Sequence, residues 1–241
     1  MDAMIYTVMS GANRALHSVE VHAGNLANAQ TDGFRSELET AHSQPMDGYG
    51  YDSRHMVSAG ENAVSGDAGV LTETGRELDA AIEGEGYFTV ADASGERYTR
   101  SGNFKVDAEG ALTESGHAVL GEGGPIVLPE FSSVRIGEDG TISVTTPGSA
   151  SVQAVDRLQL VRAPAADLQK DPNGLLVARD GQPLPAADDV HVIGGHLERS
   201  NVSPVAEMIA TMSSSRAFEM QMRMFNSVGE MADAGNRLIR G

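Results

Sequence analysis

The stretch NLANAQTDGFR, residues 25–35, marks the point at which a helical period in this sequence stops. Asn25 and Asn28 lie three residues apart, which on a helix places them on neighbouring turns beside an apolar stripe. Polar residues follow, and Gly33 can adopt the left-handed conformation that often closes a helix. The stretch therefore predicts the C-terminal end of a long helix.

Upstream of it, residues 3–29 are predicted to form one amphipathic helix. Residues that are apolar or small, His22 excepted, recur there every seven positions in two interleaved sets. The first set is Ile5, Ala12, Val19 and Leu26, and the second is Val8, Ala15, His22 and Ala29. At 1.5 Å per residue, such a helix would be roughly 40 Å long.

The C-terminal end of the chain predicts a second long helix. Pro204 suits its first turn, and Asn201 or Ser203 is a suitable N-cap. Apolar residues then follow at spacings of three and four, among them Met208, Met212, Phe218, Met222 and Phe225. Neither terminal helix has an apolar partner nearby in sequence, so the two are expected to pack on each other.

The residues between the helices predict short strands. Alternating segments such as Tyr87–Ala91 and Ile142–Val144 are separated by turn dipeptides such as Asp139-Gly140. Residues 36–70 show neither a helical nor a strand period and predict an irregular linker.

These patterns predict an α+β fold in which the N- and C-terminal helices pack together as one α-helical coiled-coil domain, with an inserted, mostly antiparallel β domain. The predicted division is an N-terminal helix over 1–35, an irregular linker over 36–73, a β-rich domain over 74–199 and a C-terminal helix over 200–241.

Charge is distributed unevenly along the chain, whose formal net charge is −17. Residues 36–200 carry 27 acidic side chains against 11 basic ones, whereas both ends are close to neutral. A nucleic-acid partner is excluded because nothing here could neutralise a run of phosphates. Near-neutral ends suit surfaces that pack against copies of themselves, and an acidic middle suits a solvated body.

The start of the sequence lacks the basic, apolar and cleavage-site segments of a classical signal peptide. No stretch approaches the roughly 18 apolar residues of a membrane-spanning helix. Taken alone, these features predict a cytoplasmic chain that does not insert into a membrane.

The sequence carries no recognisable motif for catalysis or cofactor binding. The chain has no cysteine, its seven histidines are scattered, and no phosphate loop, nucleophile elbow or zincin motif occurs. Glu83 and Glu85 could suggest the paired carboxylates of a glycoside hydrolase, but turn charges are the better interpretation. We therefore expect no enzyme activity, no cofactor and no small-molecule substrate.

Three segments carry a resemblance to a known family. Residues 25–35, residues 74–90 with their continuation from Tyr98 to Gly116, and residues 197–219 resemble, in order, the conserved blocks of bacterial flagellar rod and hook proteins. Within that family, the opening MDAMIY and the segment FEMQM at 218–222 look most like the proximal-rod branch.

The resemblance implies a structural subunit of the flagellar basal-body rod that polymerises into a tubular drive shaft and transmits motor torque. It implies that the terminal helices form the rod core with the β domain outside them. The implied partners are other rod subunits, copies of the same chain and the flagellar type III export apparatus. Export by that route without a cleaved signal would reconcile the missing signal peptide with a rod in the periplasmic space.

The residues expected to form subunit contacts share the helical ends and the signature that follows the first helix. They are Ile5, Val19, Asn25, Leu26, Asn28, Gly33, Phe34, Asn201, Val202, Met208, Met212, Phe218, Met222 and Phe225. Two other functions stay open: a distal-rod subunit of the same family, and a secreted β-rich hydrolase or carbohydrate-binding module.

Overall fold

The structure is a computed structural model, and it divides into two compact units. It describes residues 2–45, 55–148 and 151–240. The helical unit comprises residues 1–27, 37–63 and 203–241, and the β unit comprises residues 28–36 and 64–202.

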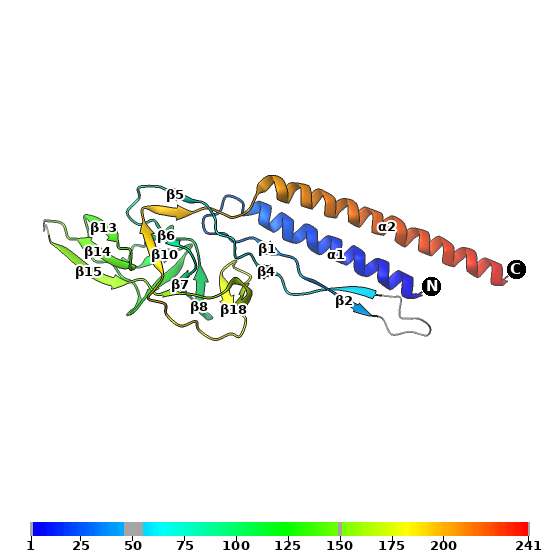
Figure 1. The fold of residues 1–241 in the computed structure, drawn as a ribbon, viewed down its shortest axis with the longest axis horizontal. Helices are drawn as coiled ribbons and strands as arrows, with labels where there is room; N and C mark the ends of the chain where they lie inside the picture. The colour runs from blue at the N-terminus through cyan, green and yellow to red at the C-terminus, as the bar shows by residue number, and fades with distance from the viewer. Residues whose placement is uncertain (1, 46–54, 149–150, 241) are drawn as a thin grey trace. The chain divides into compact units, whose positions relative to one another are not determined.

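Two antiparallel helices make up most of the helical unit. Helix α1 spans Asp2–Ala27 and helix α2 spans Pro204–Arg240. They lie side by side, so the start of α1 and the end of α2 point to the same end of this unit (Figure 1). On α1 the buried residues Val8, Ala12, Ala15, Ser18 and Val21 follow one another at steps of three or four, so they form a stripe that winds slowly around the helix.

A hairpin completes the helical unit. Strands β2 (Ala41–Pro45) and β3 (His55–Ala59) pair in antiparallel fashion, and β3 packs along α1. The Val57 N–H donates a hydrogen bond of 3.5 Å to the Ser10 hydroxyl of α1. Two further short strands, β1 (Glu37–Leu38) and β4 (Ala63–Val64), lie in the predicted linker.

The predicted fold class, with a coiled-coil domain of the two terminal helices, is wrong. A coiled coil needs apolar residues at the seam of both helices. The face of α2 that meets α1 instead carries Glu207, Ser214 and Gln221, each half-buried, at seven-residue intervals, and this series reaches an apolar residue only at the buried Val228. The Gln221 side chain lies so close to Gly11 of α1 that an added Cβ there would be 3.1 Å from it. The helices therefore pair over a strip of mixed polar and apolar side chains rather than a continuous apolar seam, with the β2–β3 hairpin as a further member of the unit.

The β unit is built from short antiparallel strands. In chain order they are β5 (Leu71–Glu73), β6 (Ala80–Glu83), β7 (Tyr87–Asp92), β8 (Gly95–Thr99), β9 (Lys105–Val106), β10 (Leu112–Glu114), β11 (His117–Gly121), β12 (Gly124–Pro125), β13 (Ser133–Ile136), β14 (Thr141–Thr145), β15 (Val152–Arg157), β16 (Leu160–Val161), β17 (Leu168–Lys170), β18 (Leu176–Ala178), β19 (His191–Gly194) and β20 (His196–Glu198). A short 3₁₀ turn, η1 (Ala165–Asp167), precedes β17.

One large sheet organises these strands, in the order β17-β18-β8-β7-β11-β10-β9, with β12 beside β11 and β16 beside β7. Strands β13, β14 and β15 form a separate antiparallel sheet, which lies at one end of the β unit (Figure 1). The pairs β6–β19 and β5–β20 complete the unit, and β20 leads toward α2.

The core of the β unit is apolar and fully buried. Phe88 and Phe104 meet edge to face at its centre, with ring centroids 5.2 Å apart. Strand β14 alternates half-buried with buried positions, and Ile142 and Val144 point into the core. A second cluster of buried residues includes Tyr98 of β8, Leu168 of β17 and Leu176 of β18.

Candidate assembly surface and its buried support

An apolar patch on α2 faces away from α1. Val205, Met208, Ile209 and Met212 occupy positions i, i+3, i+4 and i+7, so they share one helical face. All four are exposed, by 51 to 68 %. We call these four residues the outward patch. Because exposed apolar surface of this kind marks a site of protein contact, the patch is the main candidate for subunit packing.

Methionines extend the apolar character of α2 beyond the outward patch. Met220, Met224 and Met231 are also exposed. Methionine has a flexible, polarisable side chain that fills irregular gaps and tolerates different partners. The exposed surface of α2 is therefore suited to contact with a protein surface.

The structure places the predicted contact residues of the helices in two groups. Exposed on α2 are Met208, Met212, Met222 and Phe225. Half-buried are Ile5, Val19, Leu26 and Phe218, together with Asn28 in the turn after α1. Their role in contacts between subunits stays a prediction.

Asn25 is buried and makes its hydrogen bonds within its own chain. Its amide nitrogen donates to the Glu37 carbonyl at 2.9 Å, and its amide oxygen accepts from the Glu37 N–H at 2.8 Å. The Asn25 amide also reaches Glu207 of α2 at 3.4 Å, and the His22 ring lies 2.6 Å from the same carboxylate. Asn25 thus joins α1 to the backbone of β1 and to α2.

Gly33 and Phe34 belong to the β unit and hold the segment that follows α1. Gly33 has φ +69° and donates its N–H to the Glu198 carbonyl at 2.7 Å. A Cβ at Gly33 would lie 2.2 Å from the Ser101 backbone nitrogen, so only glycine fits. The Phe34 ring faces the Lys170 ammonium group, which lies 3.4 Å from the ring centroid.

Asn201 ties the segment that leaves the β unit to the segment that enters it. Its side-chain oxygen accepts from the Ser36 N–H at 2.8 Å, and its amide donates to the Asp67 carbonyl at 2.9 Å. The neighbouring Val202 is buried. Asn201 and Val202 therefore fix the end of the β unit from which α2 continues.

A buried ion cluster, which the sequence did not predict, supports these segments. The Glu198 carboxylate is 1 % exposed and pairs with Arg35 at 2.8 Å and with Arg100 at 2.5 Å. It also accepts a hydrogen bond from the Gly69 N–H at 2.8 Å. Burial lowers the pKa of Arg100, while the negative charge of Glu198 acts in the opposite direction.

The members of this cluster come from three distant parts of the chain. Arg35 ends the segment after α1, Arg100 follows β8, and Glu198 ends β20. Each lies within one of the three segments that carry the family resemblance. This shared location was the one sequence signal that could have indicated the cluster. Taken singly, each of the three residues looks like an ordinary surface charge.

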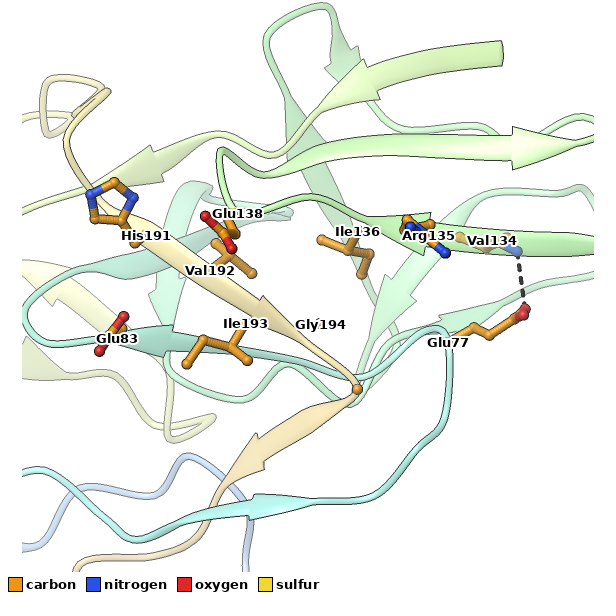
Figure 2. A pocket seen from close by; sticks show the side chains of 11 residues that line it. Glu77, Glu83, Val134, Arg135, Ile136, Glu138, His191, Val192, Ile193 and Gly194 are labelled. Atoms are coloured by element: carbon orange, nitrogen blue, oxygen red, sulfur yellow. Dashed lines mark hydrogen bonds between the residues drawn. The ribbon is translucent and has the colours of Figure 1, made fainter. Parts of the chain in front are cut away.

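Glu83 and Glu85, the carboxylates of the hydrolase alternative, line two different cavities. A groove of about 770 Å³ lies along β13 and β19, and Figure 2 shows Glu83, His191 and Glu138 on its lining. Glu85 lines a different cavity, so the two glutamates do not converge on one groove. In the part of the chain that the structure describes, no group of three or more metal-ligating side chains occurs. Nor does any described helix have the length and apolarity to cross a membrane.

Comparison with protein families defines the class of the chain. Residues 5–35 match the flagella basal body rod protein family. Residues 81–144 match the flagellar hook protein FlgE/F/G D1 domain, and residues 193–238 match the C-terminal domain of the flagellar basal body rod FlgEFG proteins. The three matches follow the order of the segments identified in the sequence, and they define a flagellar rod or hook protein.

Full-length relatives narrow this class. The flagellar basal-body rod protein FlgF of Salmonella typhimurium is 41 % identical over 248 residues, and that of Escherichia coli is 40 % identical, with 99 % of each chain covered. The FlgG rod protein of Caulobacter vibrioides is 30 % identical over 257 residues, covering 96 % of this chain and 97 % of the relative. The chain belongs to the flagellar basal-body rod protein family, and full-length relatives at 40 % identity or more carry the name FlgF. It is a structural protein and not an enzyme.

Proposed function

We propose that this chain is a subunit of the proximal rod and that it polymerises into a tubular drive shaft which transmits motor torque. The single observation that carries the proposal is the orientation of α2. One side of α2 packs against α1, and the outward patch on its opposite side stays exposed and available for contacts with other chains. A helix whose apolar side has no partner in its own chain gains stability when another protein covers that side.

The occupant of the outward patch is the helical unit of another rod subunit. Near-neutral charge favours this, because residues 201–241 carry four acidic and four basic side chains. Each contact of this kind is heterologous, with one surface meeting a different one, and repetition of it generates an open helical assembly. Residues 36–200, by contrast, carry 27 acidic side chains against 11 basic ones.

The same proposal includes export through the flagellar type III apparatus and a final position in the periplasmic space. It also includes the division of the chain at residues 35, 73 and 199. The family membership supports them, since a rod protein has to leave the cytoplasm to reach its site. The residues of the helices and of the signature segment remain the proposed contact set.

A matched pair of substitutions tests the outward patch. Val205 on α2 and Val152 on β15 are exposed by 68 and 69 %, so Val→Asp makes the same chemical change at both. Val205→Asp should lower incorporation into purified basal bodies about tenfold, because it places a charge in an apolar contact. Asp is favourable in the first turn of a helix, so α2 itself should persist.

Val152→Asp should incorporate normally and support swimming in soft agar. Export of both variants is measured first, so that a defect in secretion is not taken for a defect in assembly. Normal incorporation of Val205→Asp would remove the main support for this function.

A further inference from the structure

The buried ion cluster contains more positive than negative charge. Arg35 and Arg100 are 5 and 2 % exposed, and within the described residues both pair with the same carboxylate, that of Glu198. That carboxylate has no capacity left. One of its oxygens accepts from Arg35 and Gly69, and the other accepts twice from Arg100. One positive charge therefore stays uncompensated in a region with little access to water, which is unfavourable.

Neighbouring groups do not supply the missing negative charge. Burial raises the pKa of Tyr87, so its hydroxyl stays neutral. The Asp67 carboxylate is exposed and accepts from the Ser65 hydroxyl. Glu85 is exposed too, and among the described ion pairs neither guanidinium pairs with it.

A cavity of about 240 Å³ lies beside the two arginines. Arg35, Arg100 and Tyr87 line it together with Gly84 and Gly86. The Arg35 Nε–H is buried, and no group in the described part of the chain accepts a hydrogen bond from it. The cavity therefore combines surplus positive charge, a hydrogen-bond donor without an acceptor among the described residues, and a lining made largely of glycine, alanine and proline, with Glu85 as its one carboxylate.

We propose that this cavity binds a small oxyanion, which supplies the missing negative charge. Two sources have this chemistry: free inorganic phosphate, and the carboxylate of an acidic side chain on a neighbouring rod subunit. The second source rests on the proposed function, whereas oxyanion binding by the monomer does not. Residues 36–200 of a neighbouring copy carry 27 acidic side chains, which offer many such carboxylates.

The test begins with the full-length monomer at pH 7. Its thermal midpoint is measured in 20 mM sodium phosphate, in sodium acetate and in sodium chloride, all at one ionic strength. Phosphate should raise the midpoint by several degrees above chloride, because a ligand that binds only the folded state stabilises it. An increase with phosphate alone assigns the cavity to a free anion, and an equal increase with acetate assigns it to carboxylates. Equal midpoints in all three salts would overturn the proposal.

Two variants locate the binding in this cavity. Glu85→Gln removes a rim carboxylate and should tighten the phosphate Kd, measured by calorimetry, by about threefold to tenfold. Ala165→Glu adds a carboxylate to the lining and should abolish the response to phosphate. Unchanged phosphate binding in both variants would overturn the assignment to this cavity. If the carboxylate comes from a neighbour, Ala165→Glu should also reduce rod incorporation, whereas with a free anion its incorporation should be normal.

Discussion

Replacing Glu198 with glutamine is expected to destabilise the β unit by about 3–5 kcal/mol, the range for breaking a buried ion pair by removing one partner. Glutamine has nearly the same shape, so packing is kept and the charge alone is removed. Arg35 and Arg100 would then lie buried without a counter-charge, and one of the two oxygens that face Arg35 and Arg100 would be replaced by an amide nitrogen. An effect of 3 kcal/mol shifts a folding equilibrium more than a hundredfold.

The control for Glu198→Gln is an exposed ion pair of the same unit. The Arg162 Nη1 and Asp189 Oδ2 atoms lie 2.5 Å apart, and the two side chains are 42 and 67 % exposed. Asp189→Asn should cost less than about 1 kcal/mol, because water and salt screen exposed pairs. Hydrogen exchange in β7 and β8, followed by mass spectrometry, measures the loss of stability in both variants. Similar losses of protection in the two variants would show that the buried cluster has no special role.

Replacing Gly33 with alanine is expected to have the second-largest effect on stability, about 3 kcal/mol or more. Two causes add here. The φ of +69° is strained for alanine, and the new Cβ would lie 2.2 Å from the Ser101 backbone nitrogen. Relief of that clash would move the segment and weaken the hydrogen bond from Gly33 to Glu198.

Gly75 separates these two causes. Its φ is +68°, and no atom lies within 4 Å of an added Cβ. Gly75→Ala should therefore cost only about 1–2 kcal/mol, the amount due to the left-handed conformation. Urea unfolding followed by circular dichroism compares the two variants. Equal midpoints would mean that the close approach at Gly33 contributes nothing.

Both helices and fewer than half of the strands of the β unit could be predicted from the sequence, because each of these has a period that local residues display. The predicted helix over 3–29 corresponds to α1, and the segments Tyr87–Ala91 and Ile142–Val144 fall in β7 and β14. The strands β2 and β3 have no such signal, since every residue in them is exposed or half-buried and neither period appears.

The partner of each helical face could not be predicted from periodicity. The spacing of Met208 and Met212 defines a face of α2, but α1 and another subunit are equally compatible occupants of such a face. The coiled-coil prediction assumed that α1 covers this face, whereas in the structure Met208 and Met212 are exposed and turned away from α1. The buried cluster was missed for a related reason: Arg100 and Glu198 are 98 residues apart, and each looks solvated in sequence.

The absence of cysteine from this chain allows the most direct measurement of the outward patch. A single cysteine at Ile209, or at Val152 as the control, is reacted with a maleimide in the purified monomer and in assembled basal bodies. Both sites are exposed in the monomer, so both should react there. In basal bodies, Ile209→Cys should be protected while Val152→Cys still reacts. Equal reaction of Ile209→Cys in monomer and basal body would contradict the claim that α2 packs against neighbouring subunits through this patch.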